Sequence, residues 1–299
     1  MSNTQTLAVY GLGAMGFGMA VSLLRAGHVV HGYDLNADAV RRFVEQGGAQ
    51  GLGDPAALDA VVVCVLNAAQ TEEVLFGPDG IVAGLRPGTV VLGCATVSPD
   101  IARDMAARCA ATEVHYLDAP ISGGMARAAQ GDLAILASGP AEAFDQAAPV
   151  LEATASTVHN MGAEIGLGSA MKAVNQILAG VHIATMAEAL TFGMTQGIAP
   201  DRFLDVIRQC AGTSWMLENR APHIVAGDYT PTSSVNIWPK DLGIALDIAD
   251  AASFPVPMTA AALAQFKAAA GMGLGGEDDA AVAKVYARAA GLTLPGEQT

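Results

Sequence analysis

Residues 7–16 read LAVYGLGAMG, and residues 29–34 read VVHGYD. Each stretch begins as an apolar strand. The first runs into three glycines, the second ends on an acid, and a helical pattern lies between them. This is the order of a dinucleotide-binding unit: strand, glycine-rich turn, helix, strand and acid. We therefore predict a phosphate-binding loop at residues 11–16 of a doubly wound α/β fold.

The three glycines of this loop have different physical tasks. Gly11 allows the tight turn, Gly13 lets the backbone approach a pyrophosphate, and Gly16 lets the helix pack close to the sheet. Free N–H groups at the helix start, at the positive end of its dipole, attract the phosphates. A glycine-rich turn without a ligand is the alternative, but it needs neither the flanking strands nor the acid. The loop residues that we expect to bind the cofactor are Gly11, Leu12, Gly13, Ala14, Met15 and Gly16.

The acid at the end of the second strand bears on the choice of cofactor. The Asp34 carboxylate can accept hydrogen bonds from ribose hydroxyls, and its charge repels a 2′-phosphate. Leu35 and Asn36 follow it, so no arginine stands where a 2′-phosphate would need one. Arg41 and Arg42 come later, on the next expected helix, where a solvated position suits them. The sequence therefore favours NAD over NADP.

Composition limits the class of protein. The chain has 299 residues, of which 52% are hydrophobic and 15% charged, and its net charge is −14. This is enough apolar material for a large core, and the length fits two domains. The negative charge argues against a nucleic-acid partner and against an anionic membrane surface. The cysteines and histidines are scattered without a ligand spacing, so no metal site or disulfide is expected.

The N-terminal residues contain no secretory signal pattern, because the polar residues 2–5 lead straight into the first strand. Scattered cysteines suit a reducing compartment. We therefore expect a cytoplasmic protein.

The sequence pattern changes near residue 163. Before it, short apolar strands alternate with helical stretches, which is typical of a parallel sheet covered on both faces. After it, strand patterns vanish and apolar residues recur at helical spacing. We predict a Rossmann-type domain over residues 1–163 and an all-α substrate and dimerisation domain over residues 164–299, linked by a long helix. The helices expected in the second domain cover residues 168–195, 200–210, 234–251, 257–270 and 280–290, with stops at Gly197, Pro222, Pro231 and Pro255.

A loop after one predicted strand has the composition of an anion site. Ligands in such folds bind beyond the carboxyl ends of the strands. Ser122 there offers a hydroxyl, while Gly123 and Gly124 offer backbone N–H groups unobstructed by side chains, so the loop can hold a carboxylate. A plain flexible turn is the alternative.

A lysine falls in the first turns of the long predicted helix. Asn175 and Gln176 lie three and four residues after Lys172, and hence on the same helix face. An ammonium group on an otherwise apolar helix is costly to bury, and burial favours its neutral form, which suits proton exchange near neutral pH. The alternative is a lysine that reaches solvent, although helix starts disfavour cations.

A second lysine, Lys240, lies at the start of a later predicted helix, in the run Trp238-Pro-Lys-Asp-Leu242. It can bind an anionic group of the substrate or the cofactor. An ordinary surface ion pair with Asp241 is the alternative.

These segments, in this order and spacing, resemble the β-hydroxyacid dehydrogenases over residues 6–290. The matching motifs are the glycine loop, the run Asp118-Ala-Pro-Ile-Ser-Gly-Gly124, Gly166-Leu-Gly168 with Lys172 and Asn175, and Lys240-Asp-Leu242. The resemblance implies that Lys172 is the catalytic acid/base. It also implies that the substrate is bound by Ser122, Gly123, Gly124, Asn175 and Gln176. Beyond the glycine loop, the cofactor is expected beside Asp34, Leu35, Asn36, Leu66, Asn67, Thr71, Thr96 and Lys240.

The chain departs from the common family pattern in two places. Residues 93–96 read GCAT where a serine-rich run is usual, and Gln176 stands where many members carry a second asparagine. Residues 176–182, 228–233 and 276–279 resemble the L-threonate dehydrogenases of the family more closely. His182, within the first of these, is expected in the helix core.

We therefore expect an NAD-dependent oxidoreductase, of class EC 1.1.1.-, that transfers a hydride between nicotinamide and a small anionic hydroxycarboxylate. An L-threonate-like aldonate is the first choice. The alternatives are 2-hydroxy-3-oxopropionate (tartronate semialdehyde) reductase and 3-hydroxyisobutyrate dehydrogenase. Two further alternatives are an imine reductase and a non-catalytic cofactor-binding interaction module. Proteins of both kinds generally lack a lysine such as Lys172. We expect no nucleic-acid or membrane partner, and a homodimer or homotetramer.

Overall fold

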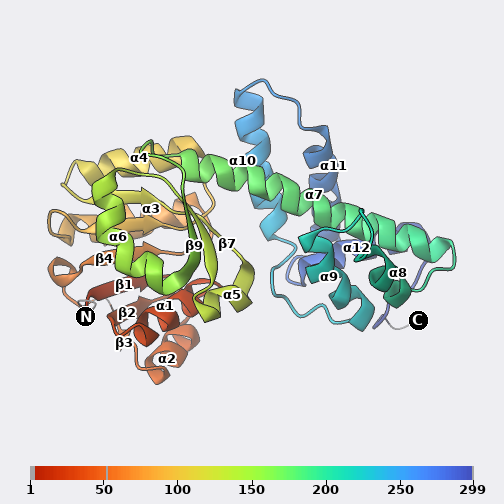
Figure 1. Cartoon of the computed structure of the whole chain (residues 1–299), viewed down its shortest axis with the longest axis horizontal. Helices are drawn as coiled ribbons and strands as arrows, with labels where there is room; N and C mark the ends of the chain where they lie inside the picture. The colour runs from red at the N-terminus through yellow and green to blue at the C-terminus, as the bar shows by residue number, and fades with distance from the viewer. Residues whose placement is uncertain (1–3, 52, 298–299) are drawn as a thin grey trace. The chain divides into compact units, whose positions relative to one another are not determined.

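The computed structural model describes residues 4–51 and 53–297. The chain divides into two compact units, residues 1–172 and 173–299. The first combines sheets with covering helices, whereas the second is helical (Figure 1). The predicted fold class, a Rossmann-type α/β part followed by an all-α part with a long helix, is confirmed. The predicted domain boundary at 163/164 stays a prediction; the division into units falls inside the long helix, which begins at Leu167.

The main sheet of the first unit has six parallel strands in the order β3-β2-β1-β4-β5-β6. This is the order of a Rossmann sheet, with β1 and β4 at the switch point. The two-residue strand β3 was not predicted, because so short a segment has no readable pattern. The strands are β1 (Thr6–Tyr10), β2 (Val29–Tyr33), β3 (Ala49–Gln50), β4 (Ala60–Val63), β5 (Val90–Gly93) and β6 (His115–Asp118).

Helices cover both faces of this sheet (Figure 1). Successive side chains of a strand point to opposite faces. Leu7 and Val9 of β1 accordingly belong to the core on one face, and Ala8 and Tyr10 to the core on the other. The first face is covered by α1 (Gly16–Arg25), α2 (Ala37–Glu45), α5 (Gly124–Gln130) and α6 (Ala141–Thr154), and the second by α3 (Ala68–Phe76) and α4 (Pro99–Ala110).

A second, three-stranded sheet differs from the single parallel sheet that the sequence pattern indicates. It contains β7 (Ile121–Ser122), β8 (Leu133–Ala137) and β9 (Ala155–Asn160). Strand β7 is antiparallel to β8, and β8 is parallel to β9. A parallel crossover needs about a dozen residues or more, and the connection between β7 and β8 is shorter. The antiparallel pairing places Ser122 opposite Ala134.

The second unit is built on a helical core. Ile183, Met186 and Leu190 of the long helix are buried in it, and Trp238 stacks on Phe266 with ring centroids 5.4 Å apart. Its helices are α7 (Leu167–Thr195), which starts in the first unit, α8 (Pro200–Ile207), α9 (Trp215–Ala226), α10 (Ile237–Ala251), α11 (Pro257–Ala269) and α12 (Ala283–Ala289).

One of these helices, α9, was not predicted. Its start has a clear signal, since the Ser214 hydroxyl accepts a hydrogen bond from the Leu217 N–H at 3.0 Å. Pro222, at which the sequence predicts a stop, lies inside the helix. The burial of Leu217 and Ile224 in the core offsets the cost of an internal proline.

Helix α7 is long and apolar enough to cross a membrane by length and composition, and 44% of its most apolar window is buried. Its buried residues Ile183, Ala184, Met186, Ala187 and Leu190 are part of the helical core. A core helix passes the same test, and burial inside the unit indicates that role.

Candidate active site

The glycine loop after β1 has the geometry that its sequence predicts. A Cβ on Gly11 would overlap the Cys64 carbonyl, and one on Gly16 would overlap the Gly11 carbonyl. The Cβ position of Gly13, by contrast, has no heavy atom of the described residues within 4 Å. Gly13 is exposed where helix α1 begins, so the loop leaves the backbone open for a pyrophosphate.

Asp34 is attached to this loop. Its carboxylate accepts hydrogen bonds from the Leu12 N–H at 2.6 Å and from the Asn36 N–H at 2.8 Å. Leu12 is buried, whereas Leu35 is 90% exposed. The carboxylate therefore lies beside the glycine turn, as an acid that accepts from ribose hydroxyls must.

The two arginines that follow are engaged on α2. Arg41 pairs with Asp38 at 2.7 Å, and Arg42 lies over the Phe17 ring, 5.2 Å from its centroid. Both guanidinium groups therefore have partners near α2.

The predicted cofactor residues after β4 form a capped turn. Asn67 accepts a hydrogen bond from the Gln70 N–H at 2.9 Å and so caps α3. Thr71, 1% exposed, donates to the Asn67 carbonyl at 2.9 Å. Leu66 is exposed, and Thr96, after β5, is half-buried. These contacts fix the backbone after the strand ends.

The loop after β6 needs its two glycines for backbone reasons. Gly123 and Gly124 have φ angles of 132° and 80°, in the region that side chains disfavour. Ser122 ends β7 just before them. The glycines therefore turn the chain sharply from the strand into α5.

Lys172 is brought to this loop by α7. Its Nζ donates a hydrogen bond to the Ile121 carbonyl at 2.8 Å, and the residue is only 8% exposed. The ammonium group is thus held next to Ser122, although Lys172 and Ile121 are far apart in sequence. A lysine that reaches solvent, the alternative from the sequence, does not fit this burial.

Asp118 is a positioning residue to which sequence reasoning gave no role. Its buried carboxylate accepts hydrogen bonds from the start of α7: from the Ser169 hydroxyl at 2.7 Å, the Ser169 N–H at 2.8 Å and the Gly166 N–H at 3.1 Å. The Ser138 hydroxyl adds a fourth at 3.2 Å. Burial raises the pKa of Asp118, although these hydrogen bonds oppose the shift. The carboxylate thereby fixes the helix turn from which Lys172 projects.

The remaining predicted site residues are connected within the second unit. Lys240 forms an ion pair with Asp241. Gln176 also donates to Asp241, at 2.5 Å, and Asn175 donates to Gln176 at 3.0 Å. Two groups are thus each assembled within one unit: the nucleotide loop, Ser122 loop and Lys172 in residues 1–172, and the amides with Lys240 in residues 173–299.

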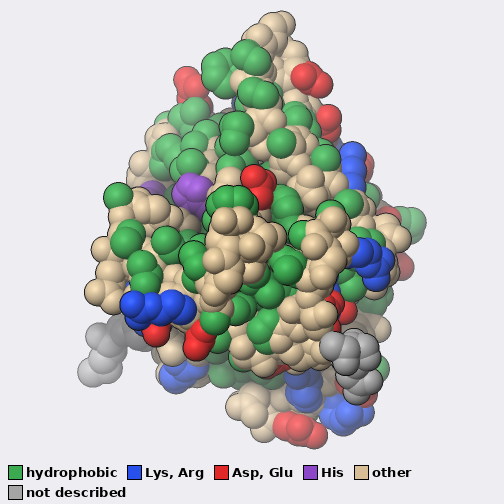
Figure 2. All heavy atoms as spheres, turned by 90° about the vertical axis from the view of Figure 1, so that its right-hand side faces the viewer, with side chains coloured by type: hydrophobic (Ala, Val, Ile, Leu, Met, Phe, Trp, Pro, Cys, Tyr) green, Lys and Arg blue, Asp and Glu red, His purple; other side chains and the backbone are tan. Residues whose placement is uncertain are grey.

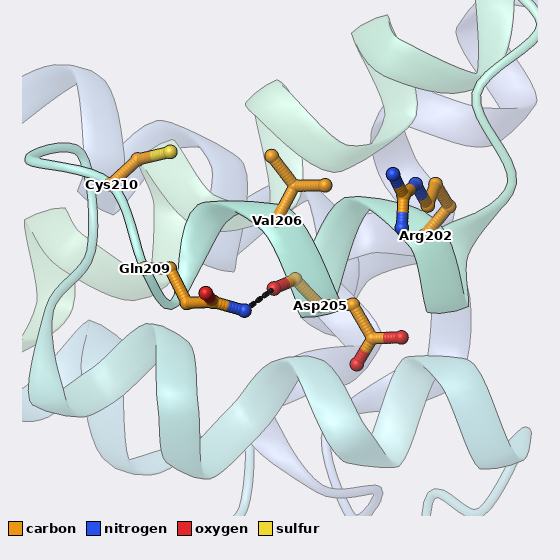
Figure 3. A pocket seen from close by; sticks show the side chains of 5 residues that line it. All are labelled: Arg202, Asp205, Val206, Gln209 and Cys210. Atoms are coloured by element: carbon orange, nitrogen blue, oxygen red, sulfur yellow. Dashed lines mark hydrogen bonds between the residues drawn. The ribbon is translucent and has the colours of Figure 1, made fainter.

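A depression on the second unit is lined by none of these groups (Figure 3). The Gln209 side chain donates to the Asp205 carbonyl at 3.0 Å there and closes the end of α8. No predicted site residue contributes to its lining, which consists of Arg202, Asp205, Val206, Gln209 and Cys210.

Two family models match consecutive parts of the chain. Residues 6–162 match the NAD binding domain of 6-phosphogluconate dehydrogenase. Residues 166–286 match the NAD-binding domain of NADP-dependent 3-hydroxyisobutyrate dehydrogenase.

Similar proteins match over nearly the full length. The L-threonate dehydrogenase of Cupriavidus necator is 49% identical over 98% of this chain and 99% of its own length. That of Escherichia coli is 46% identical over 98% and 97%. Among solved structures, 3-hydroxyisobutyrate dehydrogenase from Salmonella typhimurium superposes with a TM-score of 0.89 at 44% identity, covering 94% of this chain and 99% of that one.

Proposed function

Because the chain belongs to the β-hydroxyacid dehydrogenase family of NAD(P)-dependent oxidoreductases, we propose that it oxidises an L-threonate-like aldonate with NAD. The observation that carries the proposal is the hydrogen bond from Lys172 to the Ile121 carbonyl, which holds a buried ammonium group beside Ser122. The substrate assignment is supported by the two L-threonate dehydrogenases that match nearly the whole chain.

The glycine loop and Asp34 are the groups that would hold the dinucleotide. A dinucleotide held there would supply the hydride acceptor for oxidation and the hydride donor for reduction. The open space at the Cβ position of Gly13 supports a pyrophosphate at this place. Asp34 favours the unmodified ribose of NAD, because its charge opposes a 2′-phosphate.

Lys172 moves the proton in the proposed reaction. In oxidation its neutral amine accepts the hydroxyl proton, and in reduction its ammonium group protonates the developing alkoxide. Ser122 and the N–H groups of Gly123 and Gly124 hold the substrate carboxylate, and Asn175 binds a neighbouring hydroxyl. These groups set the carbinol carbon in place, which contributes as much as the proton transfer. Local donors of this kind must attract the anionic substrate, because the net charge of −14 repels it at long range.

Initial rates with a panel of acids test the assignment. L-Threonate, glycerate and 3-hydroxyisobutyrate are offered with NAD and with NADP. The highest kcat/KM is expected for L-threonate with NAD. A higher kcat/KM for 3-hydroxyisobutyrate would instead identify that acid as the substrate. A solved structure of a 3-hydroxyisobutyrate dehydrogenase is similar to this chain. Activity on no acid would favour the non-catalytic binding module.

A homodimer or homotetramer in the cytoplasm completes the proposal. Figure 2 shows hydrophobic side chains interspersed with charged ones over one side of the protein. Light scattering on the purified protein checks the assembly, and a monomer at micromolar concentration would contradict it. Exposed large apolar side chains of the second unit support association; they include Phe192, Ile198, Trp215, Phe254 and Met258.

A further inference from the structure

Four polar side chains of the second unit form a chain of hydrogen bonds. Lys240 donates to one oxygen of Asp241, and Gln176 Nε2 donates to the other oxygen at 2.5 Å. Asn175 Nδ2 in turn donates to Gln176 Oε1 at 3.0 Å. Gln176 and Asp241 are 6% and 3% exposed. The proposed mechanism uses no carboxylate at this place, and a buried one is costly unless it has partners.

The direction of these bonds follows from the chemistry of Asp241. A carboxylate only accepts hydrogen bonds, so Gln176 must present its NH2 group to it. The Gln176 oxygen then faces the other way, and Asn175 must present its own NH2 group to that oxygen. The Asn175 carbonyl oxygen, Oδ1, is thereby turned away from Gln176. One buried carboxylate thus fixes two amides that could otherwise be flipped.

We infer that Asp241, acting through Gln176, is a positioning residue that makes the site select acids with a hydroxyl group beyond the one being oxidised. The inference rests on the proposed function, in which Asn175 contacts the substrate. The oriented Oδ1 of Asn175 accepts a hydrogen bond from such a hydroxyl and offers nothing to a methyl group. L-Threonate keeps further hydroxyls when one reacts, whereas 3-hydroxyisobutyrate has a single hydroxyl and a methyl branch.

Two variants distinguish the hydrogen bonds from Asp241 through Gln176 to Asn175 from the ion pair of Asp241 with Lys240. Asp241→Asn keeps the size of the side chain but removes the obligatory acceptor, so the amide of Gln176 is free to turn. Gln176→Met keeps most of the volume and removes both hydrogen bonds, while the Asp241–Lys240 pair stays. The matched control is Asp247→Asn, at an exposed position of the same helix, α10.

Kinetics with two substrates test the selectivity. Both variants are expected to lose about tenfold or more in kcat/KM with L-threonate, as for the loss of one substrate hydrogen bond. With 3-hydroxyisobutyrate the change should stay below about threefold, since that acid has no second hydroxyl to donate. The control variant should retain both values. Equal losses with the two acids, or a loss confined to the KM for NAD, would overturn the inference in favour of a structural or cofactor role.

Side-chain amide NMR tests the hydrogen bonds that join Asp241, Gln176 and Asn175 without a need for turnover. In isotope-labelled protein, Asp241→Asn should shift the NH2 resonances of both Gln176 and Asn175, and Asp247→Asn should shift neither. An unmoved Asn175 resonance overturns the inference even if the protein oxidises L-threonate. A wild-type protein inactive on every acid overturns the proposed function and the selectivity with it, whereas shifted resonances would still support the oriented amides.

Discussion

The Lys172 ammonium group donates to the Ile121 carbonyl across 2.8 Å, so a helix residue is fastened to the strand residue that precedes Ser122. An amine in this position is restrained at its tip, not only at its backbone. The proton donor and the expected carboxylate-binding loop therefore keep a fixed spacing before any substrate arrives, which is the pre-organisation that catalysis by positioning requires.

Removal of this amine should lower the rate of turnover strongly and leave NADH binding nearly unchanged. Lys172→Ala is expected to lower kcat by about a thousandfold, within the range for a general acid or base, with NADH affinity nearly unchanged. Steady-state kinetics and NADH fluorescence titration measure the two effects. Lys267→Ala, at an exposed position of α11, is the control. Undiminished activity of the Lys172 variant would exclude the mechanism.

Two glycines of the nucleotide loop should respond differently to alanine. Gly13→Ala has room for its methyl group, so thermal unfolding should change little while NAD affinity falls about tenfold or more, because the methyl group occupies the pyrophosphate position. Gly16→Ala places a methyl group on the Gly11 carbonyl and should destabilise the fold by about 3 kcal/mol. Calorimetry and isothermal titration distinguish the two. Wild-type NAD binding by Gly13→Ala would show that the pyrophosphate lies elsewhere.

The charge of Asp34 can be tested apart from its contact with Leu12. Asp34→Asn keeps an oxygen that can accept from the Leu12 N–H but loses the charge that opposes a 2′-phosphate. Its ratio of kcat/KM for NADP to that for NAD should rise about tenfold, equivalent to about 1.4 kcal/mol. Asp34→Ala should also weaken NAD binding, because the Leu12 N–H of the glycine loop loses its hydrogen-bond acceptor. Asp38→Asn on α2 serves as the control, and an unchanged cofactor ratio in both Asp34 variants would refute the assignment.

Asp118 should matter for stability and for turnover together. Asp118→Ala leaves the donors of Ser169 and Gly166 without their acceptor and should lower the free energy of unfolding by about 3 kcal/mol. The kcat should fall as well, because the turn carrying Lys172 is no longer held. Asp145→Ala, exposed on α6, is the matched control for chemical denaturation and kinetics. A stable variant with normal kcat would remove Asp118 from the positioning role.

The sequence predicts most of the features that local chemistry determines. Residues 7–34 predict the strand, turn, helix and acid because the whole pattern lies within one short segment of the sequence. The order of strands and helices along the chain predicts the Rossmann-type fold, and the helical spacing of apolar residues predicts the long helix. Lys172 could be singled out because an ammonium group contrasts with its apolar helix.

Features that depend on distant partners could not be predicted in the same way. Asp118 acts through Ser169, 51 residues away, and Asp241 through Gln176, 65 residues away. A carboxylate next to a motif looks the same in sequence whether it faces solvent or a buried donor. Helix α9 was missed for a related reason, since tertiary packing outweighs the effect of Pro222.

The hydrogen bonds of Asp118 to the first turn of α7 also limit how this gene segment can change in length. Ser169 is anchored by the carboxylate, and Lys172 follows three positions later on the same helix. One residue inserted or deleted between them would rotate everything downstream by about 100°, because a helix turns once in 3.6 residues. The amine would then leave the Ile121 carbonyl entirely. The interval from Ser169 to Lys172 therefore constrains the length of the chain more strictly than the identity of the side chains between them.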